Sequence, residues 1–261
     1  MEKTMVEAIN QTLDSELSHN DKLLVFGEDV ATEGGVFRAT QQLHEKYPHR
    51  VFDTPLAEAA ILGLAFGLGV KGYTVAPEIQ FEGFTLEAMD SLVGQIARYR
   101  YRMAGTRHLP MTIRAAFGGG VGTPEMHSDS IEGLFAQVPG LRVVIPSSPY
   151  EAKGLLLSAL RCPDPVFFAE HMRLYRSVKE EVPSDDYELA LDHAHVMQTG
   201  RDVTIISYGY MVSVMKEAAQ LLQQQGISAE LIDLRTVAPI DIGTVIQSVQ
   251  KTGRAVIVQE A

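Results

Sequence analysis

The sequence predicts an α/β protein with parallel sheets that helices cover on both faces, divided into a larger first unit and a smaller second one. Strand and helix patterns alternate along the chain, which is typical of parallel sheets between layers of helices. The length of 261 residues corresponds to one or two domains at about 150 residues each. A charged, turn-rich stretch at residues 176–201 interrupts the alternation and separates the two units.

Composition and charge exclude several classes of protein. A net charge of −11 argues against a nucleic-acid surface. The single cysteine, Cys162, excludes an internal disulfide and a cysteine-based zinc site. Residues 1–20 lack the apolar core of a signal peptide, and the longest apolar stretch, 59–70, is shorter than the about 20 residues of a membrane span. We therefore expect a soluble, cytoplasmic protein with neither a membrane nor a nucleic acid as partner.

The elements of the first unit follow from apolar spacing and from turn residues. Apolar residues four apart from Met5 to Leu17 predict an amphipathic helix. The helix after residue 148 has a full start signal, because Ser148 is a candidate N-cap, proline follows it, and Glu151 lies three residues on. The other expected elements are strands at 23–26, 74–81, 111–117, 141–145 and 166–169 and helices at 57–70 and 84–103.

The second unit repeats the alternation on a smaller scale. Its expected strands are 203–208, 227–234 and 255–258, and its expected helices are 212–225 and 241–252, each closed by a glycine. This unit has three strands, and at about 60 residues it is below the usual domain size of about 100–150. Since its last strand has no helix after it, we expect a domain that is truncated or that takes its cover from a partner.

Two acidic residues follow predicted strands at what would be the same edge of a parallel sheet. Glu58 comes after the turn 53–55 and lies in the first turn of the helix 57–70. Either it complements the helix dipole, or it is held at the mouth of the sheet, where ligands usually bind. Glu28 follows the strand 23–26 and is either a solvated turn residue or a group whose proton couples to Glu58.

A glycine-rich loop, Gly118 to Gly122, precedes His127. Glycine lets the backbone approach a ligand closely. The loop is not a P-loop, because no Gly-Lys-Ser/Thr follows it. His127 precedes a helix that we expect to begin near Ser128 or Asp129. It is either a structural histidine or a group that exchanges protons beside a mobile loop.

Gln80 and Phe84 flank the end of the predicted strand 74–81. They either pack in the core or place an amide and an aromatic ring against a flat heterocycle. The sequence has no Gly-Asp-Gly followed by asparagine, the arrangement that binds a diphosphate through magnesium. If the chain binds such a cofactor, it supplies only the half of the site that lacks the phosphates.

Together these stretches resemble one family. The segments VFGEDV, RVFDTPLAEAAILGLAFGL, EIQFEGF, GGGVGTPEMHSDS, PGLRVVIPSSPYEAKGLL, LIDLRTVAPID and GRAVIVQEA are similar to the beta subunits of the thiamine-diphosphate-dependent decarboxylating component of 2-oxo acid dehydrogenase complexes. The resemblance spans essentially the whole chain. The stretches PEMHSDSIEGL and FFAEHMRLYRS are most similar to pyruvate dehydrogenase beta subunits of Gram-positive type.

The resemblance implies a domain organisation and partners. It implies a pyrimidine-binding, thiamine-diphosphate domain at residues 1–180, a linker at 181–201, and a partial transketolase C-terminal-like domain at 202–261. Two alpha and two beta subunits would share thiamine diphosphate between them. The alpha subunit would hold the diphosphate and the magnesium, and a lipoyl-bearing acyltransferase core would receive the acyl group. Family members continue past GRAVIVQEA, so we expect docking on that core to be impaired.

The resemblance also implies roles for single residues. Glu58 matches the glutamate that hydrogen-bonds the aminopyrimidine ring nitrogen, and His127 matches the histidine linked to acyl transfer. Glu28 matches an acid in a water-filled tunnel between paired active sites. Leu56, Gln80 and Phe84 match residues around the pyrimidine ring. The potassium site of some members would use backbone carbonyls near Met111, Ala159, Leu160, Cys162 and Asp164, although Pro163 departs from the pattern there.

Two questions stay open at the level of the sequence. Pyruvate is the expected substrate, with a branched-chain 2-oxo acid or acetoin as alternatives, because the alpha subunit would form much of the substrate pocket. A second reading is a truncated, non-catalytic module that binds the alpha chain without turnover. The presence of Glu58, Gln80, Phe84 and His127 argues against this second reading.

Overall fold

A seven-stranded sheet organises the first domain. Its order is β12-β6-β7-β5-β4-β2-β3, and neighbouring strands are parallel except for β12, which runs antiparallel to β6. The computed structural model describes residues 1–260. Its strands in this sheet are β2 (Leu23–Gly27), β3 (Val51–Asp53), β4 (Thr74–Phe81), β5 (Thr112–Phe117), β6 (Arg142–Val144), β7 (Val166–His171) and β12 (Thr236–Ala238).

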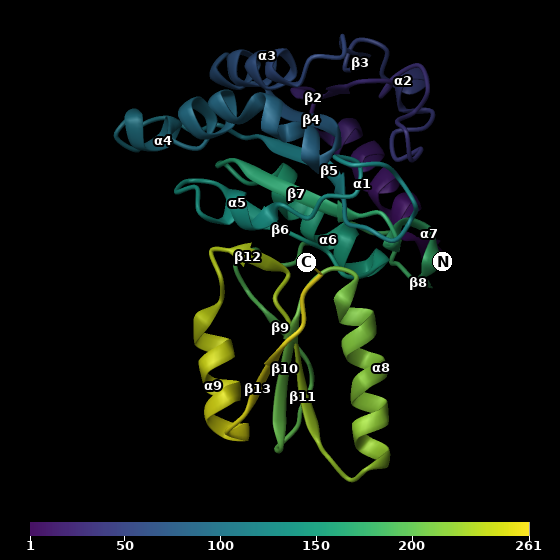
Figure 1. The fold of residues 1–261 in the computed structure, drawn as a ribbon. Coiled ribbons are helices and arrows are strands. Elements are labelled where there is room, and N and C mark those ends of the chain that lie inside the picture. Colours follow the sequence, from purple (N-terminus) through teal and green to yellow (C-terminus); the bar gives the residue numbers. More distant parts are fainter. Residues whose placement is uncertain (261) are drawn as a thin grey trace.

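Helices cover both faces of this sheet (Figure 1). The helices α1 (Met5–His19) and α6 (Pro149–Leu160) pack together over one face, and α3 (Glu58–Val70) packs over the other. Neighbouring side chains of one strand enter opposite cores, with Phe168 in the first and Phe167 in the second. This burial on both sides confirms the expected covered parallel sheet. Short helices complete the domain: α2 (Leu43–Lys46), α4 (Tyr99–Arg102), α5 (Glu132–Ala136) and α7 (Leu174–Ser177).

The helices α1 and α6 each begin at a residue whose side chain caps the helix amino terminus. Ser148 accepts a hydrogen bond from the backbone N–H of Glu151, and proline occupies the first position of α6, as predicted. In α1, Thr4 and Glu7 form a complete capping box, in which each side chain caps the other's backbone N–H. The cap of α6 therefore follows from the sequence alone, because it depends on residues three apart.

The expected single helix at 84–103 is wrong. The segment divides into a 3₁₀ helix, η1 (Glu82–Ala88), a π-helical segment, η2 (Asp90–Ile96), and the short α4. Its apolar residues keep a helical spacing, since Ala88, Leu92 and Ile96 are all buried. The spacing of the apolar residues therefore predicts which face of the segment is buried. It does not predict whether the backbone hydrogen bonds are of the 3₁₀, α or π type, because these adapt to the packing, as in π-bulges near functional sites.

The second domain has a four-stranded sheet between two helices (Figure 1). Its strands, in the order β13-β10-β11-β9, are parallel except for β9. The elements are β9 (His195–Gln198), β10 (Val203–Ser207), α8 (Met211–Gln224), β11 (Ala229–Asp233), α9 (Ile242–Thr252) and β13 (Ala255–Ile257). The strand β9 lies within the stretch that we expected to be a linker. Along β13 all three residues are exposed.

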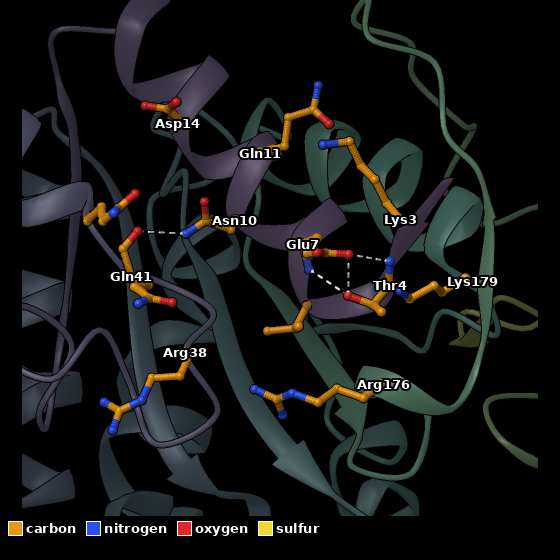
Figure 2. Close-up of a pocket in the computed structure, with 12 residues that line it drawn as sticks. Lys3, Thr4, Glu7, Asn10, Gln11, Asp14, Arg38, Gln41, Arg176 and Lys179 are labelled. Carbon is orange, nitrogen blue, oxygen red and sulfur yellow. Dashed lines mark hydrogen bonds between the residues drawn. The ribbon is translucent and has the colours of Figure 1, made fainter. Parts of the chain in front are cut away.

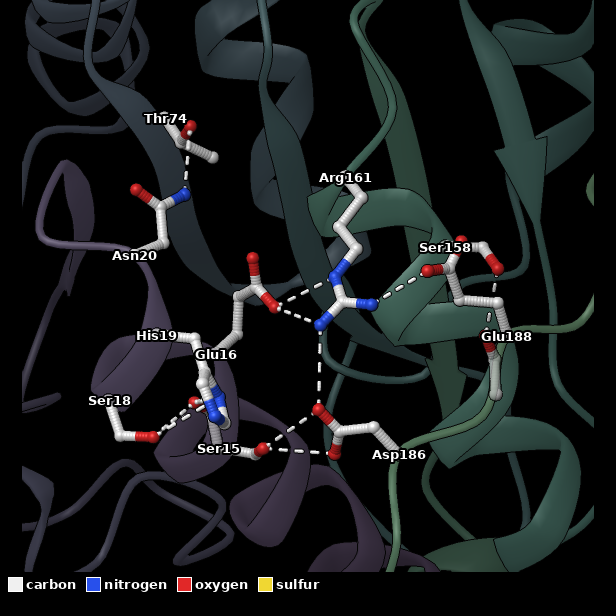
Figure 3. Close-up of polar contacts among 11 residues, drawn as sticks. Ser15, Glu16, Ser18, His19, Asn20, Thr74, Ser158, Arg161, Asp186 and Glu188 are labelled. Atoms are coloured by element: carbon white, nitrogen blue, oxygen red, sulfur yellow. Dashed lines mark hydrogen bonds and ion pairs between the residues drawn. The ribbon is translucent and has the colours of Figure 1, made fainter.

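Three connections join the domains and the connector. The strand β12 comes from the second domain but pairs with β6 of the first. The strands β1 (Glu2–Thr4) and β8 (Lys179–Glu181) form an antiparallel ribbon that holds the amino terminus beside the connector. At the end of α6, Arg161 contacts Glu16 of α1 at 2.9 Å and Glu188 of the connector at 2.7 Å (Figure 3).

Candidate functional site

The carboxyl ends of four adjacent parallel strands bring the predicted residues to one edge of the first sheet. Glu28 follows β2, and Glu58 comes five residues after β3. Gln80 lies at the end of β4, and the loop with His127 follows β5. Because these strands are neighbours in the order β5-β4-β2-β3, residues from four distant stretches of sequence share one site. Ligands usually bind at this edge of a parallel sheet.

Glu28 and Glu58 form a pair of buried carboxylates. Glu58 is the first residue of α3 and is 8% exposed, and Glu28 is 5% exposed. Burial, with the negative charges of Glu58 and Asp29, raises the pKa of Glu28 to about 7. The N–H of Ala57 opposes this shift, yet neither oxygen of Glu28 has a hydrogen bond of good geometry within residues 1–260. The proton of Glu28 is thus lost near neutral pH rather than near pH 4.

Gln80 is held at the mouth of the site by a bulge and by an acid. The register between β4 and β5 shifts between Ile79 and Phe81, so Gln80 is the irregular residue of the strand. Such bulges redirect a side chain. The side-chain amide of Gln80 donates to the carboxylate of Asp29 at 3.2 Å, which leaves the carbonyl oxygen of the amide for a ligand.

His127 lies against two phenylalanines at the end of β4. Its ring centre is 4.6 Å from that of Phe81 and 4.9 Å from that of Phe84. Its Nδ1 is 3.0 Å from the carbonyl oxygen of Glu125. Since a carbonyl only accepts, Nδ1 carries the hydrogen, and Nε2 of the neutral ring is left as a proton acceptor.

The expected helix directly after His127 is wrong. The next helix, α5, begins at Glu132 and has five residues. The dipole of a helix acts within its first turn, so it gives no argument about the charge of His127. Residues 128–131 are irregular because Ser128 and Thr123 bond to each other rather than capping a helix.

The apolar residue selected from the sequence, Leu56, is open to solvent. The side chain of Leu56, two residues before α3, is 79% exposed. A large exposed apolar side chain two residues before Glu58 suits contact with a ligand or with another subunit.

Comparison with known proteins identifies the family. Residues 1–178 match the family described as "Transketolase, pyrimidine binding domain", and residues 192–261 match "Transketolase, C-terminal domain". The chain is 58% identical to the pyruvate dehydrogenase E1 component subunit beta of Bacillus subtilis and 55% identical to that of Staphylococcus aureus, over 99% of this chain and 80% of each relative. The chain belongs to the pyruvate dehydrogenase E1 beta-subunit family. This family depends on thiamine diphosphate, as expected.

Solved structures agree with the two transketolase domains that the family models match. A protein described as "Split gene transketolase, inactive beta4 tetramer" superimposes with a TM-score of 0.81 at 26% identity, covering 98% of this chain and 78% of that one. A transketolase mutant from Pichia stipitis has a TM-score of 0.70 at 16% identity, covering 99% of this chain and 39% of that one, which shows the fold alone. The predicted order of a pyrimidine-binding domain and a transketolase C-terminal-like domain is confirmed.

The residues of the expected potassium site lie at the opposite edge of the sheet from the candidate site described above. Met111 directly precedes β5, and Asp164 precedes β7. The carbonyl oxygen of Met111 accepts from the N–H of Val166 at 2.8 Å, and that of Ala159 accepts from Cys162 at 3.1 Å. Leu160 ends α6 beside them. The carbonyls of Ala159 and Leu160 lie in the last turn of α6, where the helix dipole favours a cation.

A cavity of about 770 Å³ lies away from the site, between α1 and the loop 38–42 (Figure 2). Its wall combines the cations Arg38 and Arg176 with the acid Glu7. None of the residues expected to contact the cofactor lines it. Among residues 1–260, no three His, Cys, Asp or Glu side chains are grouped to hold a metal ion, and no helix is long and apolar enough to cross a membrane.

Three residues of the site were not selected from the sequence. Asp29 positions Gln80, and Phe81 packs on His127. Glu82 is fully buried and accepts the N–H of Ile131 at 3.0 Å, so it ties the loop of His127 to η1. All three lie next to selected residues, in VFGEDV and EIQFEGF, but only the fold shows which of the neighbours face the site.

Proposed function

We propose that this chain is the beta subunit of an acetyl-transferring pyruvate dehydrogenase that works with an alpha subunit. The reaction would be the oxidative decarboxylation of pyruvate, with reductive acetylation of the lipoyl group on an acyltransferase core. The observation that carries the proposal is the meeting of Glu28, Glu58, Gln80, Phe84 and His127 at one sheet edge. The names of the relatives support pyruvate over a branched-chain acid or acetoin.

The residues at this edge fit the aminopyrimidine half of thiamine diphosphate. The carboxylate of Glu58 is buried at the first position of α3, and beside it both oxygens of the buried Glu28 lack a hydrogen bond of good geometry. Gln80 offers an amide, and Leu56 and Phe84 offer apolar surface for a flat ring. When bound, the cofactor supplies the electron sink for decarboxylation. Glu58 would hold the ring nitrogen through a hydrogen bond and keep a proton exchanging there.

Other residues would move protons and guide the acyl group. His127, with Nε2 as an acceptor, would serve acyl transfer to the lipoyl group, and Glu28 would relay protons toward a paired site. General acid–base help of this kind contributes about 10²–10⁴ in rate. The diphosphate and magnesium would be held mainly by the alpha subunit, because this sequence lacks the Gly-Asp-Gly motif.

Three finer features complete the proposal. Potassium would bind at the carbonyls near Met111, Ala159, Leu160, Cys162 and Asp164, far from the chemistry, and would stabilise the fold. The subunits would assemble as two alpha and two beta chains. The location would be the cytoplasm, since a single cysteine suits a reducing compartment.

A steady-state assay of the reconstituted alpha and beta pair tests the proposal. Pyruvate, a branched-chain 2-oxo acid and acetoin are compared at saturating thiamine diphosphate and magnesium. We expect the highest kcat/KM for pyruvate. A higher kcat/KM for another substrate would contradict the pyruvate assignment, and turnover of none of the three would favour the non-catalytic module.

A further inference from the structure

The second domain holds both ends of the loop that carries His127. Near its start, the carboxylate of Glu260 accepts the backbone N–H of Gly119 at 2.6 Å. Just past its end, the hydroxyl of Tyr208 donates to Glu132 at 2.7 Å. Both Glu260 and Tyr208 belong to the second domain, whereas Gly119 and Glu132 belong to the first, so these hydrogen bonds cross the domain junction.

A buried histidine fixes the position of Glu260. The ring of His171 is 2% exposed, lies edge-on to Phe117 with 5.0 Å between ring centres, and stacks on Tyr210 at 5.3 Å. Its Nδ1 accepts the N–H of Arg173 at 3.3 Å, so the hydrogen of the neutral ring is on Nε2. This Nε2–H donates to the second oxygen of Glu260 at 2.9 Å. Burial lowers the pKa of His171, which keeps this tautomer neutral near pH 7.

The glycines of the loop are required by this cluster. Gly118 has φ +89°, and a β-carbon there would overlap the ring of His171. Gly120 has φ +83°, and a β-carbon there would overlap the guanidinium of Arg173. The backbone thus passes directly over His171 and Arg173, close enough for Glu260 to bind the N–H between the two glycines. The glycines therefore let the loop lie against His171 and Arg173 of the first domain, where Glu260 of the second domain reaches its backbone.

We propose that Glu260 is a positioning residue for His127. By binding Gly119 on one side and His171 on the other, Glu260 fixes where the loop leaves β5 and so sets how the loop presents His127 to an incoming lipoyl group. This inference rests on the proposed role of His127 in acyl transfer. It adds that the second domain controls this step through one carboxylate.

The chemistry of Glu260 allows graded variants. The carboxylate accepts two hydrogen bonds, from Gly119 and from His171. Glu260→Ala removes both. Glu260→Gln keeps one acceptor oxygen for Gly119 but turns an N–H₂ toward the N–H of His171. Glu217 lies exposed on α8 of the same domain, so Glu217→Gln is a matched control.

The test uses the full chain and the reconstituted enzyme. Hydrogen exchange of residues 118–128 is measured in the chain alone. In the reconstituted pair, the rate of reductive acetylation of a lipoyl domain is compared with the rate of reduction of an artificial electron acceptor. The ratio of the two rate losses in His127→Ala serves as the reference. For Glu260→Ala we expect faster exchange in the loop. We also expect a loss in the lipoyl assay about tenfold larger than in the acceptor assay, equivalent to about 1.4 kcal/mol.

Glu260→Gln should show an intermediate difference between the losses in the two assays, and Glu217→Gln should show no difference. Unchanged loop exchange in Glu260→Ala would overturn the inference. Equal losses in both assays together with a lower melting temperature would also overturn it, in favour of a purely structural role. If the wild-type pair acetylates no lipoyl domain, the proposed function fails, whereas the exchange measurement still decides whether Glu260 holds the loop.

Discussion

Two acids at neighbouring strand ends differ in pKa because both their burial and their hydrogen bonds differ. Asp53, at the end of β3, accepts the backbone N–H groups of Ala31 at 2.6 Å and Thr32 at 3.1 Å. Although burial acts in the opposite direction, these bonds lower the pKa of Asp53. Glu28 is buried beside Glu58 and Asp29, and only the N–H of Ala57 acts against these effects, so its pKa rises to about 7. The same chemical group is therefore structural at one position and available for proton transfer at the other.

Glu28 makes the stability of the chain depend on pH. Its pKa is raised in the folded state, so the unfolded state releases the proton first as pH increases. Stability should therefore decrease between about pH 4.5 and 7 and then level off. Because burial also raises the pKa of Asp233 and of Glu82, we expect Glu28→Gln to reduce this decrease rather than remove it. The variant should melt at a higher temperature than wild type at pH 8, by about 2–4 °C per kcal/mol removed. The melting temperatures of wild type and Glu28→Gln, recorded from pH 4.5 to 8, measure this effect.

Glu217→Gln serves as the control for this pH series, because Glu217 is exposed on α8 and should leave the wild-type profile unchanged. An identical pH dependence in Glu28→Gln and wild type would show that Glu28 ionises as in the unfolded chain.

Glu58 should be essential for turnover but not for folding. Glu58→Gln keeps the shape of the side chain at the start of α3, so the melting temperature should change little. The amide cannot take up and release a proton, so we expect kcat in the reconstituted enzyme to decrease by about 10²–10⁴. The measurement is kcat at saturating cofactor. Wild-type rates in this variant would remove Glu58 from the proposed role.

At the level of elements, the sequence predicts what depends on near neighbours. The strand 74–81 is found with the expected bounds as β4, and the Ser148 cap of α6 is present. The segment 84–103 fails because a helical spacing of buried residues permits 3₁₀, α and π hydrogen bonds alike. The helix expected at Ser128 fails because that serine bonds to Thr123 in the loop.

A glycine of η1 sets the distance between Phe84 and the loop of His127. A β-carbon on Gly83 would meet the carbonyl oxygen of Met126 at 2.4 Å, which is closer than atoms can approach. We expect Gly83→Ala to displace the loop and to reduce lipoyl acetylation about tenfold or more, a change of about 1.4 kcal/mol or more, with cofactor affinity nearly unchanged. Kinetics with a lipoyl domain and cofactor titration measure the two effects.

Gly63 in α3 provides the matched control for this substitution. Nothing lies within 4 Å of its β-carbon position, and alanine favours the helix, so Gly63→Ala should be neutral or slightly stabilising. Equal kinetics in Gly83→Ala and Gly63→Ala would show that the loop tolerates the displacement.

At the level of the whole molecule, the contacts that complete the site were not predictable from local pattern. The strand β12 has three residues and pairs with β6 across about 90 positions of sequence, and β1 pairs with β8 over an even longer separation. Glu260 reaches Gly119 across 141 positions. The resemblance to a family located Glu58, Gln80 and Phe84 by matching segments, but it could not show which parts of the second domain contact the loop.

The whole-molecule prediction is that this chain alone does not decarboxylate pyruvate. Its sequence has no Gly-Asp-Gly motif for magnesium and diphosphate, and residues 1–260 contain no group of metal-binding side chains. This chain alone would contact only the aminopyrimidine half of thiamine diphosphate and would make no charged contacts to the diphosphate. The cofactor should therefore bind weakly until an alpha subunit is added. Calorimetric titration of the cofactor and turnover with an artificial acceptor, each with and without alpha, measure both effects. Turnover by chain purified free of any alpha subunit would show that this chain completes the site by itself.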